Sequence, residues 1–388
     1  MLGKEVLDVG RKGQDKKSAP VRLIVVHPLN DYSGSPRVLA DFLTCDLLHP
    51  KAVTIITSRS NGFLHDGLGQ RTLLWYPRWK TKLLKVSSFF FLQLQLFVAT
   101  LYTILRSHFK GERVVVINNT MLSMGSMLAS RLCGTTNIVY LHEWTIGSQR
   151  VGWIVRFLSK YLIRLMAHEV VFVSKFLSNR FEVGVNLKTT ILPNGLRSDF
   201  DPNLPINFQS KFEQGKVLFV GYLKKNKGIF ELLKIAQMMP STSFQAVLNC
   251  SASEISDFTS NYLLPKNLEF LPQQIDIQSY YQEAFLVMNL SLAEACLESF
   301  SLSILEGMSC GNPVIVPLVG GHCEYFDSSA GDAIDAKNTD EIIAFIVRLQ
   351  GDFTLWKKYS QSAVELVKDY SAEAFQNRAG RFLSKYVK

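Results

Sequence analysis

Short apolar runs recur along the chain, separated by longer stretches that have the spacing of amphipathic helices. The first run is Val21–Val26, and a second series begins at Lys216–Gly221, beyond the middle of the chain. Apolar runs of about four to eight residues bounded by turn residues are typical of buried parallel strands. The alternation therefore predicts an α/β protein with a doubly wound sheet in each half. Further strands are expected at 53–57, 114–120, 137–142, 169–174, 244–248, 268–271 and 314–316, and helices at 229–239, 339–349 and 372–386.

Two stretches of the first half carry more apolar residues than a surface helix needs. Residues 86–105 are mostly apolar and match the length of about 20 residues that spans a bilayer. Because Gln and Thr residues interrupt this stretch, we expect first a buried helix, then a helix on a membrane surface, and last a span. Residues 150–167 combine helical apolar spacing with Arg and Lys. This pattern favours equally a membrane-surface helix and a helix packed on the sheet.

The stretch 298–316 holds two carboxylates, Glu298 before a predicted helix and Glu306 within it. Gly311 and Pro313 would end that helix before the strand 314–316. The amino end of a helix suits a phosphate, and a carboxylate can accept hydrogen bonds from two sugar hydroxyls. The alternative is a capping box formed by Ser303 and Glu306, which would make Glu306 structural. The spacing alone favours neither interpretation.

Together with Gly320–Gly321–His322–Cys323–Glu324, this stretch resembles the nucleotide-binding signature of retaining family-four glycosyltransferases, the group 1 type with the GT-B fold. The resemblance covers residues 21–388 and implies two Rossmann-like domains that face a central cleft. It implies an acceptor-binding domain at 21–195, a nucleotide-sugar-binding domain at 196–370 and a helix at 371–388 that returns to the first domain. Residues 1–20 are polar and basic, without the apolar segment of a signal peptide, and are expected to be a flexible leader. The stretch 200–215 is expected to be an irregular linker.

The resemblance also assigns roles to residues on both sides of the cleft. Glu306 would bind the ribose of the donor, Lys227 its diphosphate, and Glu298 and His142 its sugar. The catalytic candidates are accordingly His142, Glu298 and Lys227. In the family an arginine follows the glycine at position 221, whereas this chain has Tyr222, which cannot make bidentate contacts to phosphate.

The remaining candidates lie beside these residues in the sequence. The expected donor-binding set is Gly34, Ser35, Gly221, Lys227, Ser299, Phe300, Ser301, Leu302 and Glu306. Candidates for additional phosphate contacts are Arg37, Lys224 and Lys225, and candidates for the acceptor side are Glu143 and Trp144.

The composition and net charge indicate which classes of binding partner to expect. The chain of 388 residues has 47% apolar and 19% charged residues, a net charge of +9 and a pI near 9.1, as expected for a globular protein with anionic partners. Because no basic aromatic motif stands out, nucleotide diphosphates and an anionic membrane surface are expected rather than nucleic acid. The six cysteines lack metal-type spacing and are expected to be reduced core residues of a cytosolic protein. No metal or cofactor is expected besides the donor substrate.

The resemblance implies a retaining, metal-independent hexosyltransferase. It would use a nucleotide-diphosphate sugar and a glycan or lipid-linked glycan acceptor, in bacterial polysaccharide or lipopolysaccharide synthesis. Its expected location is the cytoplasm, with peripheral contact at the inner membrane. The alternatives are a catalytically inactive nucleotide-sugar-binding protein, which Tyr222 suggests, and a sugar-nucleotide epimerase. A nicotinamide dehydrogenase is disfavoured because the glycine fingerprint is absent.

Overall fold

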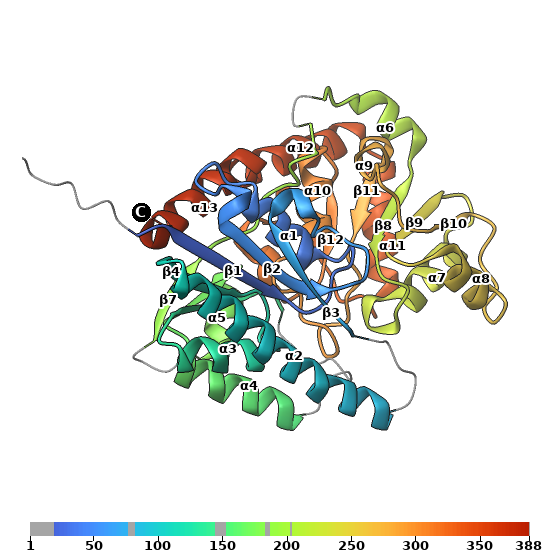
Figure 1. Cartoon of the computed structure of the whole chain (residues 1–388). Helices are drawn as coiled ribbons and strands as arrows, with labels where there is room; N and C mark the ends of the chain where they lie inside the picture. Colours follow the sequence, from blue (N-terminus) through green and yellow to red (C-terminus); the bar gives the residue numbers. More distant parts are fainter. Residues whose placement is uncertain (1–18, 77–81, 144–152, 183–186, 202–203, 388) are drawn as a thin grey trace, which may run out of the picture.

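The protein has two parallel sheets, each covered by helices on both faces (Figure 1). The structure is a computed structural model that describes residues 19–76, 82–143, 153–182, 187–201 and 204–387. Within these residues the first sheet has seven strands in the order β3-β2-β1-β4-β5-β6-β7, and the second has six in the order β10-β9-β8-β11-β12-β13. The predicted pair of doubly wound sheets is thus confirmed.

The first half contains the first sheet and its helices. Their bounds are β1 Val21–His27, α1 Gly34–Leu43, β2 Val53–Ser58, β3 Gln70–Leu74, α2 Lys82–Phe109, β4 Arg113–Asn118, α3 Met124–Leu132, β5 Thr136–Leu141, α4 Trp153–Met166, β6 Glu169–Phe172, α5 Lys175–Phe181 and β7 Lys188–Ile191. The central strand β1 pairs with β2 and β4, in a register that aligns Val25 with Ile55 and Ile117. All three side chains are buried, as the continuous apolar runs predict.

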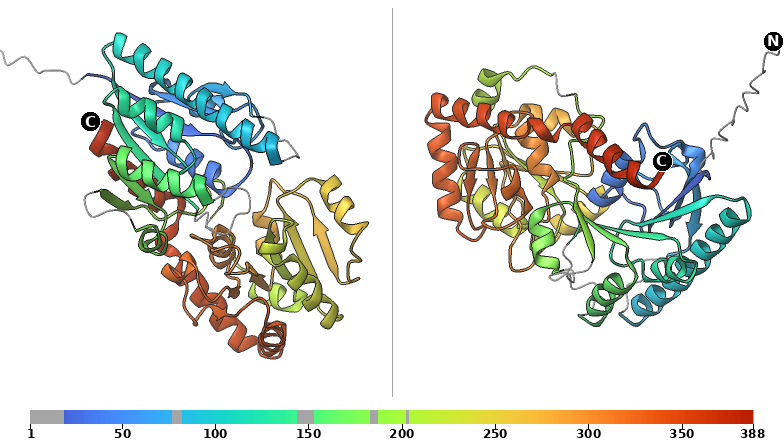
Figure 2. Two further views of the ribbon diagram at one scale, coloured as in Figure 1. Left: turned by 90° about the horizontal axis from the view of Figure 1, so that it is seen from below. Right: turned by 90° about the vertical axis from the view of Figure 1, so that its left-hand side faces the viewer.

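The second half repeats this arrangement. Its elements are α6 Phe208–Gln214, β8 Val217–Gly221, α7 Ile229–Met238, β9 Phe244–Leu248, α8 Ala252–Thr259, β10 Leu268–Leu271, α9 Gln278–Glu283, β11 Leu286–Met288, α10 Leu302–Ser309, β12 Val314–Val316, β13 Gly331–Ala333, α11 Thr339–Gln350, α12 Phe353–Leu366 and α13 Ala372–Val387. The last helix, α13, packs on α1 of the first half (Figure 2). There the Gln376 amide donates hydrogen bonds to the Asp41 carbonyl at 2.5 Å and to Thr44 Oγ1 at 2.8 Å. The predicted return of the C-terminal helix is confirmed.

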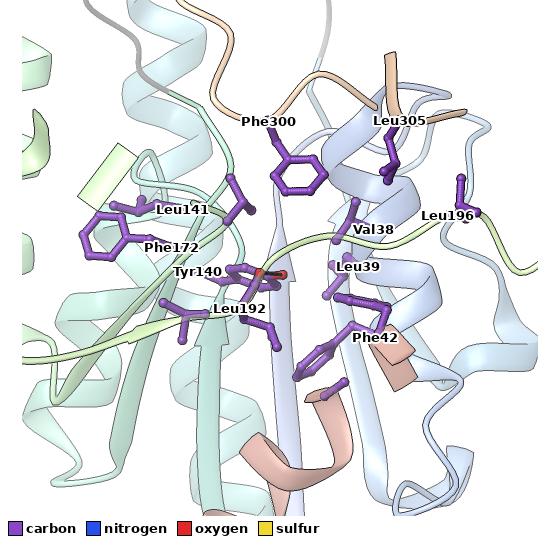
Figure 3. Packing of buried hydrophobic residues seen from close by; sticks show 14 of the residues in the cluster. Val38, Leu39, Phe42, Tyr140, Leu141, Phe172, Leu192, Leu196, Phe300 and Leu305 are labelled. Carbon is purple, nitrogen blue, oxygen red and sulfur yellow. Dashed lines mark hydrogen bonds between the residues drawn. The ribbon is translucent and has the colours of Figure 1, made fainter. Parts of the chain in front are cut away.

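The two halves share one buried apolar cluster (Figure 3). Phe300 and Leu305 from the second half belong to it, together with residues of α1, β5 and β6. These are Val38, Leu39, Phe42, Tyr140, Leu141 and Phe172. The shared cluster holds α10 against the first half.

The expectation of an irregular linker at 200–215 is wrong for its second part, where α6 forms. The Asn207 side chain caps this helix by accepting from the Ser210 amide at 3.0 Å. The buried Lys211 ammonium donates to the carbonyls of Tyr281 and Cys310, each at 2.8 Å. These contacts to distant segments stabilise a seven-residue helix that the local sequence does not predict.

The first expectation for 86–105, a buried helix, holds for one face only. Leu92, Leu96 and Ile104 of α2 are buried, whereas the opposite face of the helix carries exposed apolar side chains. The core prediction for the cysteines likewise holds for the buried Cys45 and Cys310 but not for Cys323, which is exposed.

Candidate functional site

The motif of the second half lies directly against strand ends of the first half. Ser299 Oγ donates to the carbonyl of His142, which follows β5, and Ser174 Oγ donates to the Ser299 carbonyl at 2.6 Å. A Cβ atom at Gly34, the first residue of α1, would lie 3.1 Å from Leu302 Cδ1. Parallel sheets bind ligands at the carboxyl ends of their strands, and both sheets present these ends here.

Ser301 has an unusual backbone conformation at the start of α10. Its φ is +65°, in the left-handed region that non-glycine residues seldom adopt. Tyr325 holds this turn by donating from its hydroxyl to the carbonyls of Phe300 and Ser301, at 2.7 and 2.6 Å. Asn289 Nδ2 donates to Ser301 Oγ at 2.8 Å. Because α10 begins at Leu302, Ser303 is already helical and the capping-box alternative for Glu306 is wrong.

Gly320 and Gly321 lie beneath the loop that carries Glu298. The Gly321 amide donates to the Glu298 carbonyl at 2.8 Å. A Cβ atom at Gly321 would stand only 1.9 Å from the Ser299 carbonyl oxygen, which is too close for any side chain. The glycine pair therefore allows the two loops to pack together and fixes the position of Glu298.

Glu298 and Lys227 form an ion pair in the cleft. Lys227 Nζ lies 2.5 Å from Glu298 Oε1, and Ser291 Oγ donates to the same oxygen at 2.7 Å. Burial alone would raise the pKa of Glu298, but the charge of Lys227 and the hydrogen bonds from Lys227 and Ser291 lower it to about 2. Burial alone would lower the pKa of Lys227, whereas the charge of Glu298 holds it above its ordinary value. Both groups are therefore charged at neutral pH.

His142 is buried and oriented by Asn119. Its Nε2 lies 2.7 Å from Asn119 Oδ1, while Asn119 Nδ2 contacts His27 Nδ1 and the Ser35 carbonyl, each at 3.2 Å. Since Asn119 Oδ1 can only accept, His142 Nε2 carries the proton and Nδ1 is left as an acceptor. Among the described residues, Nδ1 has no hydrogen-bond partner although it is buried. A hydroxyl group of a ligand would satisfy it.

Burial lowers the pKa of His142 to about 3 and that of His27 to about 4. Because an unfolded histidine binds a proton below about pH 6.5 and the folded one does not, stability falls as pH falls below that value. We expect His142 alone to cost the wild type about 2 kcal/mol between pH 7 and pH 5. The variant His142→Gln should lose about 2 kcal/mol less over this range, as urea denaturation at both pH values can measure. An unchanged pH dependence of stability in His142→Gln would contradict the assignment.

Glu306 lies in a cluster of partners from both halves. Tyr281 donates its hydroxyl to Glu306 Oε2 at 3.0 Å, and Arg37 Nη2 of α1 lies 3.7 Å from Glu306 Oε1. Burial raises the pKa of Glu306, and the charges of Arg37 and Arg197 oppose this rise. Arg37, which the sequence suggested for the phosphates, thus lies against Glu306. Sequence reasoning missed Tyr281 and Arg197, because nothing local marks a tertiary partner.

Tyr222 lies where the family has its arginine. Burial and the charges of Asp31 and Glu143 raise the pKa of Tyr222 to about 12. Lys224 Nζ stands 4.0 Å from the centre of the Tyr222 ring, a cation–π contact, whereas Lys225 is exposed in a short 3₁₀ turn. The Tyr222 ring therefore fixes the position of Lys224, one of the three lysines (Lys224, Lys225 and Lys227) that follow β8.

The other predicted residues divide between the cleft and the core. Gly221 ends β8, and Glu143 lies within the electrostatic environment of Lys227 and Glu298. Phe300 is a core residue whose ring packs on Tyr325 at 5.1 Å. Trp144 lies outside the described residues.

An Asp-x-Asp triplet at Asp199–Phe200–Asp201 has a spacing that sugar-nucleotide metal sites use. Asp199 is paired with Arg197 at 2.5 Å, and the Asp201 backbone exchanges two hydrogen bonds with Gln278. Within the described residues, no group of three His, Cys, Asp or Glu side chains could hold a metal ion.

Comparison with known proteins connects the second half to a family. Residues 204–363 match the family model described as glycosyl transferases group 1. A sucrose synthase of Denitrovibrio acetiphilus is 33% identical over 98 residues, which are 24% of this chain and 12% of that protein. An uncharacterized glycosyltransferase of Haemophilus influenzae is 23% identical over 231 residues, 57% of this chain and 62% of that protein. The chain therefore spans less than two thirds of the length of either curated relative.

Solved structures resemble most of the chain, including both halves. Anabaena HepE in complex with UDP-glucose has a TM-score of 0.73 and 17% identity, covering 94% of this chain and 99% of that chain. Sucrose-phosphate synthase from Thermosynechococcus elongatus has a TM-score of 0.72 and 16% identity, covering 94% and 98%. At such identities the likeness establishes the fold. The predicted GT-B architecture is confirmed.

Proposed function

We propose that this chain, whose residues 204–363 match the model of the group 1 glycosyl transferases, is a glycosyltransferase of that group. It would transfer a sugar from a nucleotide-diphosphate sugar to a glycan or lipid-linked glycan, with retention at the anomeric carbon. The observation that carries the proposal is the convergence of groups from both halves at the start of α10. There the Lys227–Glu298 pair lies next to Ser299, which contacts His142, and the buried Nδ1 of His142 has no hydrogen-bond partner among the described residues.

Each part of the cleft suits one part of the donor. The first amides of an α-helix lack intrahelical partners, so the amino end of α10 would bind the diphosphate together with Lys227. Glu306 would accept from the ribose hydroxyls, and His142 Nδ1 from a hydroxyl of the sugar. HepE, which has the same fold, is described in complex with UDP and with UDP-glucose, which supports a nucleotide sugar as donor.

The proposed chemistry is displacement on one face of the sugar. The acceptor oxygen forms a bond to the anomeric carbon as the bond from that carbon to the diphosphate oxygen breaks, and the acceptor proton passes to the departing diphosphate. Both carboxylates of the motif are already held, Glu298 by Lys227 and Ser291, and Glu306 by Tyr281 and Arg37. Neither is therefore placed as a free covalent nucleophile, which supports a mechanism that depends on positioning and charge stabilisation.

The donor can be identified by thermal unfolding with UDP, GDP, dTDP and their sugars. A ligand that binds only the folded state raises the melting temperature by mass action. We expect one nucleotide to raise it and one of its sugars to raise it further, and that sugar is then tested for transfer to lipid-linked acceptors. Binding without transfer or hydrolysis would favour an inactive nucleotide-sugar-binding protein, the second candidate that Tyr222 supports. Conversion of the donor without an acceptor would indicate an epimerase.

Lys224 and Lys225 offer a matched test of the phosphate site. Because Lys224 is held over Tyr222 and Lys225 is exposed, only Lys224 is placed to replace the family arginine. We expect Lys224→Ala to weaken binding of the nucleoside diphosphate about tenfold, the size of one charge-assisted hydrogen bond. Lys225→Ala should leave it nearly unchanged. Equal losses in the two variants, measured by calorimetry, would show a diffuse charge effect instead.

A further inference from the structure

Three helices of the first half, α2, α3 and α4, lie side by side on one face of the first sheet (Figures 1 and 2). Their outer sides carry large apolar residues exposed to solvent, and we call this surface the α2–α4 face. It comprises Phe90, Phe91, Leu94, Val98, Tyr102, Leu105 and Phe109 of α2, Leu128 and Leu132 of α3, and Phe157, Leu158, Tyr161 and Leu165 of α4. Soluble proteins rarely expose so many large apolar side chains on neighbouring helices without a partner.

The exposed side chains of α2 follow a helical pattern of their own. Phe90, Leu94, Val98 and Tyr102 are spaced four residues apart and are 61%, 58%, 55% and 64% exposed. The buried residues Leu92, Leu96 and Ile104 lie on the opposite side of the helix and belong to the core. The helix thus has two apolar faces, one of which the protein itself does not cover.

α2 is long and apolar enough to cross a membrane by composition, but the structure ties it to the protein. Gln93 Nε2 donates to the Leu122 carbonyl at 2.9 Å, and Gln93 Oε1 accepts from the Gly125 amide of α3 at 3.0 Å. A Cβ atom at Gly125 would lie 2.0 Å from the Gln93 carbonyl, so the two helices pack backbone to backbone. A spanning helix would break these contacts and expose Leu92, Leu96 and Ile104 of the core.

The charge of the three helices indicates what kind of partner would cover the α2–α4 face. They contain no Asp or Glu, and their basic residues are Lys82, Lys85, Arg106, Arg131, Arg156, Lys160 and Arg164. Arg106 and Arg131 are exposed, while Lys160 and Arg164 contact Glu182, which follows α5. Two copies of this face in a symmetric dimer would bring like charges together, which is unfavourable. Exposed apolar side chains on helices that carry basic and no acidic residues instead fit the acyl chains and anionic headgroups of a bilayer.

We propose that the α2–α4 face docks the protein on an anionic bilayer as a peripheral surface, with its aromatic and aliphatic side chains in the interface and its Arg and Lys side chains at the headgroups. The inference rests on exposure, packing and charge and does not depend on the proposed activity. It leaves the inner face of α2 buried, as first expected from the sequence, and assigns the outer face to the second expectation, a helix that lies on the membrane.

The test is flotation of the full chain with vesicles of phosphatidylcholine alone and of phosphatidylcholine mixed with phosphatidylglycerol. The wild type should float with the mixed vesicles and much less with the neutral ones, and salt should weaken the binding. The variant Phe90→Gln/Leu94→Gln/Tyr102→Gln should bind at least about tenfold more weakly. The control Met238→Gln/Leu263→Gln/Val347→Gln changes exposed apolar residues of the second half and should bind like the wild type.

Arg106→Glu/Arg131→Glu tests the charge without altering the apolar surface and should remove the preference for phosphatidylglycerol. Three results would overturn the proposal: no flotation of the wild type, equal binding to both vesicles, or unchanged binding of the Phe90/Leu94/Tyr102 variant. A lipid-free dimer in sedimentation that this variant dissociates would assign the face to a second copy and also overturn it. The nucleotide-induced thermal shift should persist in all variants, so a failed proposed function is distinguished from a failed docking surface.

Discussion

The variant Lys227→Met should lose at least about a thousandfold in turnover, because Lys227 is the cation placed to stabilise the charge of the departing diphosphate. It should also unfold more easily. Removing the lysine of this partly buried ion pair leaves its carboxylate without a countercharge, which lowers the free energy of unfolding by about 3 kcal/mol. Glu298, which keeps its charge through Lys227 and Ser291, would be that carboxylate. Turnover of the donor and urea denaturation measure the two effects.

The double variant Lys227→Met/Glu298→Gln separates structure from catalysis. With no unpaired charge left, it should regain most of the stability that Lys227→Met loses, yet turnover should stay low. If the double variant recovers turnover along with stability, the ion pair is purely structural. Near-normal turnover in the single variants Lys227→Met and Glu298→Gln would likewise contradict the catalytic assignment. The stability contributed by Glu298 should also be lost as pH falls from about 4.5 towards its folded pKa of about 2, and the double variant should lack this loss.

The strands could be predicted because their signal is local. Phe244–Leu248 and Leu268–Leu271 begin and end where their apolar runs do. Gly320 and Gly321 mark a close approach of two loops that only glycine allows. The glycine pair in the sequence therefore indicates that this loop packs tightly against the loop that carries Glu298.

The residues that the sequence did not assign act across long distances. Asn119 orients His142 from the turn that follows β4, and Tyr281 reaches Glu306 from α9. Arg37 could be recognised as a cation beside the cleft, but its place at Glu306 depends on how the two halves pack. For α2 the apolar run correctly predicts a helix, while only the packing on α3 distinguishes its covered face from its exposed one.

Glu306 is the residue at which binding can be separated from chemistry. In Glu306→Gln the side chain keeps its shape but loses its charge, so it becomes a weaker acceptor and no longer offsets the charge of Arg37, which keeps its ion pair with Asp41. We expect the dissociation constant of the nucleoside diphosphate to rise about thirtyfold, the equivalent of about 2 kcal/mol, while turnover at saturating donor changes less. Glu294→Gln, which alters an exposed carboxylate paired with Lys337, is the matched control and should bind normally.

Comparing UDP with 2′-deoxy-UDP, or the matching pair for whichever base binds, shows whether Glu306 contacts the ribose itself. The wild type should prefer the ribonucleotide, because an acceptor left without its hydroxyl partner in a buried site costs binding energy. Glu306→Gln should lose most of this preference. If the variant binds both nucleotides more weakly but keeps the preference, Glu306 acts only by fixing Arg37 and Tyr281 between the two halves. Since Oε1 and Oε2 already face these two partners, the ribose hydroxyls would join a carboxylate whose position is set before the nucleotide arrives.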